Sequence, residues 1–159
     1  MVLKIKPITD NDIPRIENWL KKDYVIKWFE NAGAWLDEIR GRDGKFSFIK
    51  HFIALCDETP IGFCQYYECA GAKEEAYSSY PLAGSYSLDY LIGEEGFLGK
   101  GLGKAIIRLL IEEIFSQPNA ERVLAKPEED NNASRSALLS AGFIYDAETK
   151  VFYVNKGQV

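Results

Sequence analysis

Three glycines in five residues, Gly99, Gly101 and Gly103, point most directly to chemistry in this chain. They follow an apolar run over residues 85–92 and precede an amphipathic stretch over residues 104–116. Glycine carries no Cβ, so successive backbone N–H groups can converge on one anion at the positive end of a helix. The spacing therefore predicts a phosphate-binding loop between a strand and a helix, one that needs no metal ion.

Two common phosphate motifs do not fit this loop. A Walker loop ending at Lys104 requires glycine at the position of Leu98 and serine or threonine at the position of Ala105. The dinucleotide pattern requires a third glycine at Lys104 or at Ile106, depending on the glycine from which it is counted. A glycine-rich turn that binds no ligand is the alternative to a phosphate loop.

Asp89 is an acidic residue inside the apolar run, where Leu88 and Tyr90 flank it. Burial disfavours a charged carboxylate, so this position should raise the pKa of Asp89 and improve it as a proton acceptor near neutral pH. An aspartate on the solvent side of an edge strand is the alternative. We expect Asp89 to act as a general base.

On these residues the chain resembles the GNAT superfamily of N-acetyltransferases. The acetyl-coenzyme A loop of that family reads Gln or Arg, two residues, Gly, one residue, and Gly or Ala; Leu98, Gly101 and Gly103 occupy those positions. The chain looks closest to the aminoglycoside 6'-N-acetyltransferase branch, whose members share the Gly-Lys-Gly-Leu-Gly loop and an aspartate ahead of it, here Asp89, ten residues before Gly99. Further segments in the family's order extend the resemblance over most of the chain: Trp19-Leu20, Trp28-Phe29, Pro60-Ile61-Gly62-Phe63, Pro127, Asn131 and Ala141-Gly142-Phe143.

The resemblance implies a fold, a reaction and a set of site residues. The fold is α/β (α+β), a single-domain acyl-CoA N-acyltransferase fold over residues 1–159 with a central, mixed, mostly antiparallel sheet flanked by helices. The reaction is direct transfer of acetyl from acetyl-coenzyme A to a primary amine of a small cationic acceptor, such as an aminoglycoside, with Asp89 as base and no metal. The implied acceptor-binding residues are Trp28, Glu74 and Asp89. The implied cofactor-binding residues are Leu91, Ile92, Leu98, Gly99, Lys100, Gly101, Leu102, Gly103, Lys104 and Asn131.

Two positions depart from the family's pattern. Many relatives carry a tyrosine seven residues after the motif asparagine, placed to protonate the leaving thiolate, but counting from Asn131 that residue is Leu138. Lys126 occupies the position of a substrate-binding aspartate in the aminoglycoside branch. These departures keep two alternatives open: an acetyltransferase for a siderophore precursor or a protein amine, and a coenzyme A-binding sensor without catalysis.

Acidic and aromatic residues gather in the segment that precedes the Asp89 strand. The glutamates could bind a cationic acceptor and the tyrosines could stack on it, whereas a solvated acidic loop is the alternative: Glu68, Glu74, Glu75, Tyr66, Tyr67, Tyr77 and Tyr80. The formal net charge of -5 favours a polycationic small molecule as partner over nucleic acid or an anionic membrane.

Composition sets the remaining expectations. A chain of 159 residues, 47% of them hydrophobic, suits one globular domain, present as a monomer or homodimer. Lys4 and Lys6 interrupt the first apolar residues in a strand-like alternation, unlike a signal peptide, so we expect a cytoplasmic protein. With His51 as the one histidine, a multi-histidine metal centre is excluded, and we expect the cysteines to be buried free thiols on a hairpin: Cys56, Cys64 and Cys69.

Mixed strands and helices must position these residues. The patterns predict strands over residues 3–8, 51–56, 61–68, 85–92, 122–125, 143–145 and 149–155, and helices over 10–22, 34–40, 104–116 and 131–141. A polar segment over residues 69–84 separates the hairpin from the Asp89 strand. We expect Thr9 or Asp10 to cap the first helix, Asn131 to cap the last, and Trp19 to lie in the core.

Overall fold

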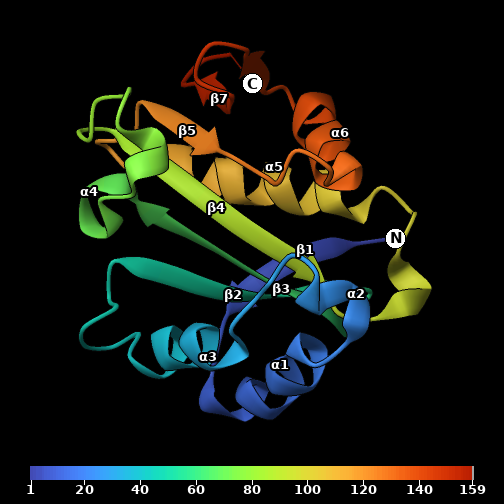
Figure 1. The fold of residues 1–159 in the computed structure, drawn as a ribbon. Coiled ribbons are helices and arrows are strands. Elements are labelled where there is room, and N and C mark those ends of the chain that lie inside the picture. Colours follow the sequence, from blue (N-terminus) through green and yellow to red (C-terminus); the bar gives the residue numbers. More distant parts are fainter. Residues whose placement is uncertain (159) are drawn as a thin grey trace.

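A seven-stranded sheet forms the centre of the computed structural model, which describes residues 1–158 (Figure 1). Its strands are β1 (Leu3–Pro7), β2 (Ile49–Cys56), β3 (Thr59–Glu68), β4 (Ser85–Ile92), β5 (Arg122–Ala125), β6 (Ile144–Asp146) and β7 (Val151–Asn155). Their order is β1-β2-β3-β4-β5-β7-β6, and every neighbouring pair is antiparallel except β4 and β5. The predicted mixed, mostly antiparallel sheet is confirmed.

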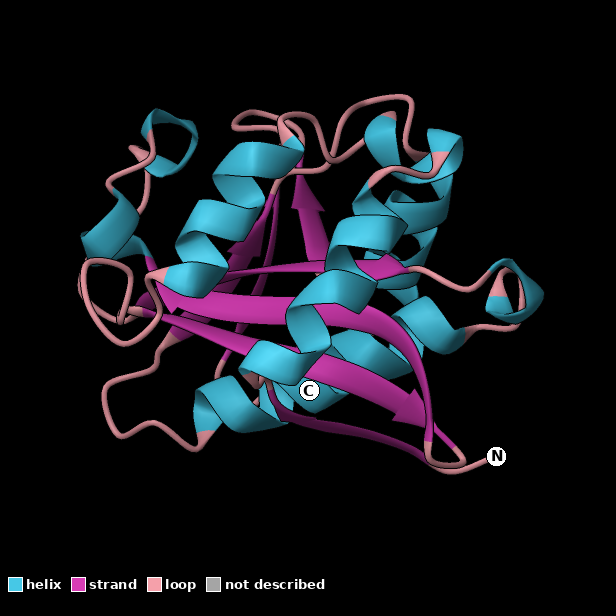
Figure 2. Ribbon diagram, turned by 90° about the horizontal axis from the view of Figure 1, so that it is seen from below, coloured by secondary structure: helices cyan, strands magenta, loops and turns pink. Residues whose placement is uncertain are grey.

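Helices cover both faces of this sheet (Figures 1 and 2). They are α1 (Ile13–Leu20), α2 (Asp23–Ile26), α3 (Ala32–Arg40), α4 (Cys69–Ala72), α5 (Leu102–Phe115) and α6 (Asn132–Ser140). Apolar residues of α1, α2 and α3 pack on one face against Ile53, Phe63 and Leu91. The apolar side of α5 packs on the other face of the sheet. There it contacts strand side chains that point the opposite way from Ile53, Phe63 and Leu91, such as Cys64 and Leu88. The pleat of β4 therefore sends neighbouring residues into two different layers.

The parallel pair β4 and β5 separates after only three residue pairs. Ser85–Ser87 pair with Arg122–Leu124, whereas β4 continues to pair with β3 as far as Ile92 opposite Gly62. Within the described chain, no strand pairs with residues 88–92 on the β5 side. The sheet is therefore open beside the second half of β4, the half that carries Asp89.

The first predicted helix is shorter than its pattern suggested. The prediction of one helix over residues 10–22 was wrong: a 3-10 turn over Asp10–Asp12 leads into α1, which ends at Leu20. Lys22 is extended, and its Nζ donates to the carbonyl of Gly93 at 2.6 Å, a long-range contact that the helical pattern does not encode. A separate short helix, α2, follows. Trp19 is 1% exposed and lies in the core, as predicted.

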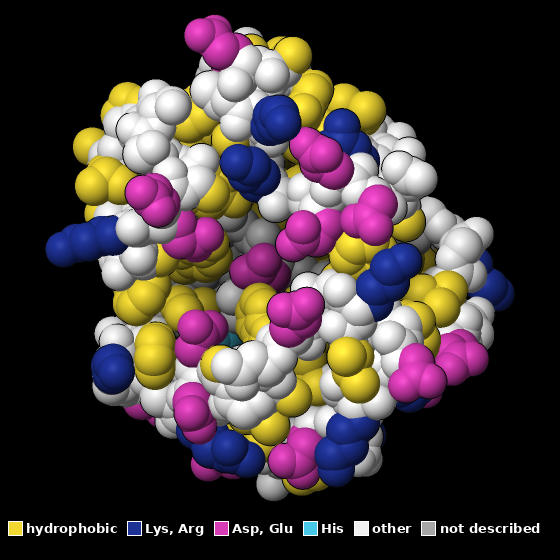
Figure 3. Space-filling view, viewed as in Figure 1, with side chains coloured by type: hydrophobic (Ala, Val, Ile, Leu, Met, Phe, Trp, Pro, Cys, Tyr) yellow, Lys and Arg dark blue, Asp and Glu magenta, His cyan; other side chains and the backbone are white. Residues whose placement is uncertain are grey.

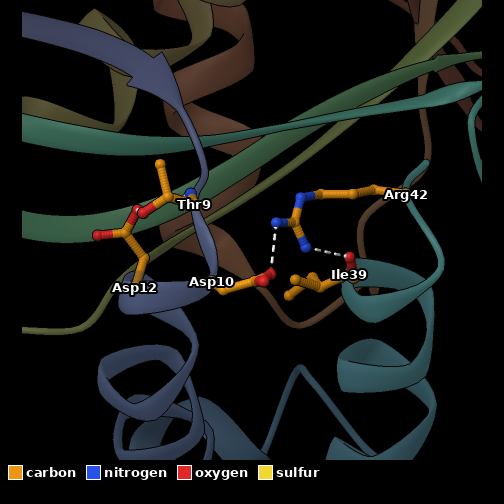
Figure 4. A network of polar contacts seen from close by, with 5 residues as sticks. All are labelled: Thr9, Asp10, Asp12, Ile39 and Arg42. Carbon is orange, nitrogen blue, oxygen red and sulfur yellow. Dashed lines mark hydrogen bonds and ion pairs between the residues drawn. The ribbon is translucent and has the colours of Figure 1, made fainter.

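A polar network holds the start of α1 against the end of α3 (Figure 4). Thr9 donates its backbone N–H to Asp12 Oδ2 at 2.9 Å and caps the 3-10 turn. The N-cap of α1 is Asp12, so the predicted cap at Thr9 holds for the turn and not for the helix. Arg42 Nη2 lies 2.6 Å from Asp10 Oδ1, and Arg42 Nη1 donates to the carbonyl of Ile39 at 2.8 Å. These contacts fix α3, which carries an aromatic and an acidic side chain toward the site described below.

Other predicted elements match with small shifts. β4 and β5 have the predicted bounds, α3 begins two residues early, and α5 begins at Leu102 instead of residue 104. The polar segment over residues 69–84 contains α4 and a 3-10 turn, Glu75–Tyr77. The cysteines are buried free thiols; Cys56 and Cys64 lie on the hairpin as predicted, whereas Cys69 begins α4. Across residues 1–158, no helix combines the length and apolarity needed to cross a bilayer.

Candidate active site

Asp89 lies on the face of β4 that packs toward α1, α2 and α3. Gln65 is the residue directly opposite it on the neighbouring strand β3. Gln65 Nε2 donates to Asp89 Oδ2 at 2.9 Å. Removal of water from around the carboxylate raises the pKa of Asp89 from 3.8 to about 6. The Gln65 hydrogen bond opposes this rise, and the charges of Glu74 and Glu38 add to it. The expected raised pKa is confirmed.

The row of paired residues continues into β2, where His51 lies opposite Gln65. His51 is buried, and burial lowers its pKa to about 4, so the imidazole is neutral at pH 7. Among the described residues, neither ring nitrogen of His51 nor Oε1 of Gln65 has a hydrogen-bond partner. The Gln65 side chain thus contacts Asp89 through its NH2 group. Neither Gln65 nor the neutral His51 beside it carries a positive charge that could neutralise the Asp89 carboxylate.

Asp89 opens onto a cavity that we call the acidic cavity. In Figure 3, acidic side chains gather around a hollow on this face of the molecule. Glu74 and Glu128 add carboxylates to the wall of the cavity, and Lys126 alone of its lining residues, within the described chain, is cationic. Its lining is Trp28, Phe29, Trp35, Tyr67, Glu74, Tyr77, Leu88, Asp89, Tyr90, Ala125, Lys126, Pro127, Glu128, Asn131, Ser134 and Leu138.

Glu74 is held at this cavity by Tyr67, whose hydroxyl donates to the Glu74 carboxylate. Burial raises the pKa of Glu38 of α3, and the negative charge of Glu74 adds to the rise. Like charges placed this close destabilise one another, so a cation between them would relieve the repulsion. The acidic cavity is therefore suited to a positively charged group with a flat or apolar body, which its aromatic walls can contact.

A second, larger and more apolar cavity lies beside the glycine loop, and we call it the glycine-loop cavity. It runs along the unpaired side of β4 to the first turn of α5. Its lining is Tyr24, Val25, Trp28, Phe29, Tyr90, Leu91, Ile92, Leu98, Gly99, Gly101, Leu102, Gly103, Lys104, Asn131, Ala133, Ser134, Ser136, Ala137 and Ser140. All the predicted cofactor-binding residues line it except Lys100, whose side chain is exposed outside it.

The three glycines serve two different purposes. Gly99 and Gly101 have φ values of +72° and +74°, and a Cβ at either would have no heavy atom within 4 Å. They give the loop its left-handed turns and leave the space beside it open. Gly103 instead allows a close approach, because a Cβ there would lie 3.1 Å from the Tyr90 ring. Gly101 caps α5, so the free N–H groups of the first helical turn face the open space.

Five residues line both cavities and form what we call the junction: Trp28, Phe29, Tyr90, Asn131 and Ser134. Asn131 caps α6, since its Oδ1 accepts from the backbone N–H of Ser134 at 3.2 Å, which confirms the predicted cap. The junction lies where β4 and β5 separate, so the opening in the sheet connects the face that carries Asp89 with the face covered by α5 and α6.

The structure separates the remaining acidic and aromatic candidates. Tyr67 and Tyr77 line the acidic cavity with Glu74, whereas the other four lie elsewhere. Tyr66 is buried in the core, Tyr80 is partly buried, and Glu68 and Glu75 do not line either cavity. Leu138, the first departure from the family pattern, is buried in the wall of the acidic cavity. Lys126, the second, lines the same wall.

Sequence reasoning missed several residues of the site, among them Gln65, Glu38, Tyr90, Glu128 and Ser134. Strand alternation predicts that Gln65 shares a face with Asp89 only if the pairing register of β3 and β4 is already known. Glu38 comes from a helix distant in sequence. Tyr90 and Ser134 are distant in sequence and line both cavities beside the opening of the sheet. In the part of the chain that the structure describes, no group of three or more His, Cys, Asp or Glu could hold a metal ion.

Comparison with known proteins gives a consistent result. A family model described as an acetyltransferase (GNAT) domain matches residues 9–151. Aminoglycoside N(6')-acetyltransferases type 1 from Klebsiella pneumoniae and from Serratia marcescens are each 23% identical over 149 residues, which is 87% of this chain and 72% of theirs.

Solved structures agree with the fold. Aminoglycoside acetyltransferase AAC(6')-Ib, solved in complex with coenzyme A, has a TM-score of 0.83 and 20% sequence identity over 98% of this chain and 95% of its own. The aminoglycoside N(6')acetyltransferase from Legionella pneumophila has a TM-score of 0.73 and 22% identity over 96% of this chain and 91% of its own. The predicted fold class is confirmed.

Proposed function

Because the chain belongs to the acetyltransferase (GNAT) family, as its sequence resemblance predicted, we propose that it transfers acetyl from acetyl-coenzyme A to a primary amine of a small cationic acceptor. One observation carries this proposal. A glycine-loop cavity suited to the donor and an acidic cavity suited to the acceptor meet at one junction, with Asp89 on the acceptor side. The relative AAC(6')-Ib has been solved with coenzyme A and with an aminoglycoside and acetyl-coenzyme A.

The glycine-loop cavity fits the chemistry of coenzyme A. The pyrophosphate would lie against the N–H groups of Gly101, Gly103 and the first turn of α5, with Lys104 as the nearest cation. The pantetheine arm would follow the apolar wall past Leu91 and Ile92, where the free edge of β4 offers backbone hydrogen-bonding groups. Lys100, which lies outside the cavity, would contribute only long-range charge.

Asp89 is the proposed general base. An amine acceptor is protonated at pH 7, so one proton must leave before the nitrogen can attack the thioester carbonyl. A carboxylate with a pKa of about 6 is ionised at pH 7 yet more basic than an ordinary aspartate. Gln65 orients the carboxylate through Oδ2 and leaves Oδ1 for the acceptor. Transfer would be direct, without an acetylated enzyme.

The acceptor is proposed to be a cation held by Glu74, Glu128 and Asp89, with Trp28 against its body. Lys126 faces the same space and would repel the most highly charged molecules. It favours an acceptor with fewer positive charges than a typical aminoglycoside, such as a diamine or a hydroxylysine-type amine, over the aminoglycosides on which the relatives named above act.

Release of free thiol from acetyl-coenzyme A tests the proposal across a panel of amines. The panel contains kanamycin-type aminoglycosides, linear diamines, hydroxylysine-type amines and a lysine peptide, each with a control that lacks amine. We expect amine-dependent thiol release and an acetylated amine of the corresponding mass. Tight binding of acetyl-coenzyme A without turnover on any amine would instead indicate a coenzyme A sensor and would contradict the proposed transfer.

A further inference from the structure

Two side chains at the start of α2 donate hydrogen bonds to the backbone at the end of β4. Tyr24 Oη donates to the carbonyl of Ile92 at 2.9 Å, and Lys22 Nζ donates to the carbonyl of Gly93 at 2.6 Å. Tyr24 packs with the layer formed by α1, α2 and α3, yet it also lines the glycine-loop cavity. It therefore reaches from the Asp89 face of the sheet to the space proposed for the donor.

The Ile92 carbonyl lies on the open side of β4. Gly93 donates its backbone N–H to the carbonyl of Ile61 in β3 at 2.7 Å, so the backbone groups of Gly93 face β3. Successive residues of an extended strand turn their N–H and C=O groups to opposite sides. The backbone groups of Ile92 consequently face the side on which, within residues 1–158, no strand pairs with this half of β4. Tyr24 thus lies at the edge along which the pantetheine arm is proposed to run.

The hydrogen-bonding capacity of Tyr24 selects the kind of group that it can contact. A phenol carries one O–H donor, and Tyr24 uses this donor on the Ile92 carbonyl. Burial raises the pKa of Tyr24, and the charges of Glu95 and Glu94 add to the rise, so the hydroxyl keeps its hydrogen at neutral pH. Any further hydrogen bond to Oη is one that the oxygen accepts. The complementary group of a ligand is therefore an N–H.

Acetyl-coenzyme A carries such N–H groups in the two amides of its pantetheine arm. Its ionised phosphates, its sulfur and its thioester carbonyl accept hydrogen bonds and do not match Oη, and the adenine amino group lies beyond the pyrophosphate. Ile92 lies three residues after Asp89 in β4, which is about 10 Å along the strand. When the acetyl group lies near Asp89, an amide within the arm is therefore expected beside Ile92 and Tyr24.

This inference rests on the proposed function, in which the glycine-loop cavity takes acetyl-coenzyme A. We propose that Tyr24 is a cofactor-binding residue whose Oη, oriented by the Ile92 carbonyl, accepts a hydrogen bond from an amide N–H of the pantetheine arm. The contact holds the arm against the free edge of β4. It adds a wall from α2 to a site whose other polar groups come from β4, the glycine loop and α6.

Tyr24→Phe removes the hydroxyl and keeps the ring, and Tyr86→Phe is its matched control. Tyr86 is buried, donates to Asn119 Oδ1 at 2.7 Å and lines neither cavity. Calorimetric titration measures the affinity for coenzyme A and for the nucleotide that remains when its pantetheine arm is removed. We expect Tyr24→Phe to bind coenzyme A about fivefold more weakly than the wild type and the nucleotide equally well. Tyr86→Phe should bind both ligands like the wild type.

Every other result for Tyr24→Phe overturns the assignment. Unchanged affinity for coenzyme A would show that Tyr24 makes no contact with the arm. An equal loss for coenzyme A and the nucleotide would show a general disturbance of the cavity. Tighter binding of coenzyme A would show that Tyr24 competes with the arm for the Ile92 carbonyl.

A second measurement uses the wild type and so remains decisive even if Tyr24→Phe does not fold. The ligands are two coenzyme A analogues, each with one pantetheine amide replaced by an ester, which removes the N–H and keeps the carbonyl. We expect the wild type to bind one analogue about fivefold more weakly than coenzyme A, and Tyr24→Phe to bind that analogue and coenzyme A equally. Equal affinity of the wild type for coenzyme A and both analogues would refute the contact.

The two proposals fail differently. A wild type that binds coenzyme A in a Tyr24-dependent way but acetylates no amine loses the proposed transfer and keeps the Tyr24 contact. A wild type that acetylates an amine, while Tyr24→Phe binds coenzyme A with unchanged affinity, loses the Tyr24 contact alone.

Discussion

The surroundings of Asp89 in the folded protein disfavour its charged form. Its pKa rises from 3.8 to about 6 on burial beside Glu74 and Glu38, so ionisation opposes folding. Asp89 favours folding most below about pH 4, where it is protonated in both the folded and the unfolded protein. This part of the free energy of unfolding is lost as the pH rises through about 6, where Asp89 of the folded protein ionises. An ionised Asp89 thus costs this protein stability at neutral pH, as expected of the proposed general base.

Asp89→Asn should therefore stabilise the protein at neutral pH. We expect its free energy of unfolding to exceed that of the wild type by on the order of 2 kcal/mol at pH 7, with the difference vanishing near pH 4. Urea denaturation at both pH values measures it. A variant less stable than the wild type at pH 7 would show that the Asp89 carboxylate is not destabilised by its surroundings.

Gln65→Leu should change the pH dependence of the reaction. The Gln65 hydrogen bond lowers the pKa of Asp89, so its loss should move the acid limb of the rate profile upward by about half a unit to one unit. Gln117→Leu is the control, because Gln117 lines neither cavity. An acid limb that stays in place in Gln65→Leu would show that Gln65 does not act through Asp89.

At the scale of elements, the turn into α5 depends on glycine conformation. Gly101 has a φ of +74°, so Gly101→Ala should cost about 1–2 kcal/mol of stability and weaken acetyl-coenzyme A binding about tenfold. Gly96→Ala is the control, because a Cβ there also meets no atom within 4 Å but the backbone is not left-handed. Thermal unfolding and equilibrium titration measure the two effects. Equal affinity in both variants would contradict a ligand on this loop.

The elements that the sequence predicted best were those whose apolar residues repeat without interruption at strand or helix spacing. β4 and β5 have the predicted bounds, and α5 differs by two residues at its start because Gly101 already caps it. The helix predicted through residue 22 ends at Leu20, and Lys22 beyond it is extended and makes a tertiary contact to Gly93. Local pattern carries no information on such contacts.

The site was predictable only in part for the same reason. The glycine loop and Asp89 lie close together in sequence, so their spacing predicted them. Gln65, in contrast, meets Asp89 through strand register, and Tyr90 and Ser134, which are distant in sequence, line both cavities beside the point where β4 and β5 separate. That separation is a property of the sheet and is not encoded in any one strand.

At the scale of the whole molecule, net charge and the acidic cavity both favour cationic acceptors, and Lys126 opposes them. Lys126→Glu should raise kcat/KM for a polycationic amine by about tenfold, with a smaller gain at high salt. Lys156→Glu changes the net charge equally outside both cavities and should have little effect. Equal gains in the two variants would mean that overall charge, not the cavity, selects the acceptor.

The most direct test of the account is amine-dependent thiol release by the wild type and Asp89→Asn from about pH 5 to about pH 9. We predict a wild-type rate that rises with a midpoint near pH 6, and an Asp89→Asn rate at least about 100-fold lower at pH 7 with unchanged affinity for acetyl-coenzyme A. A near-normal kcat in Asp89→Asn at pH 7 would contradict the account.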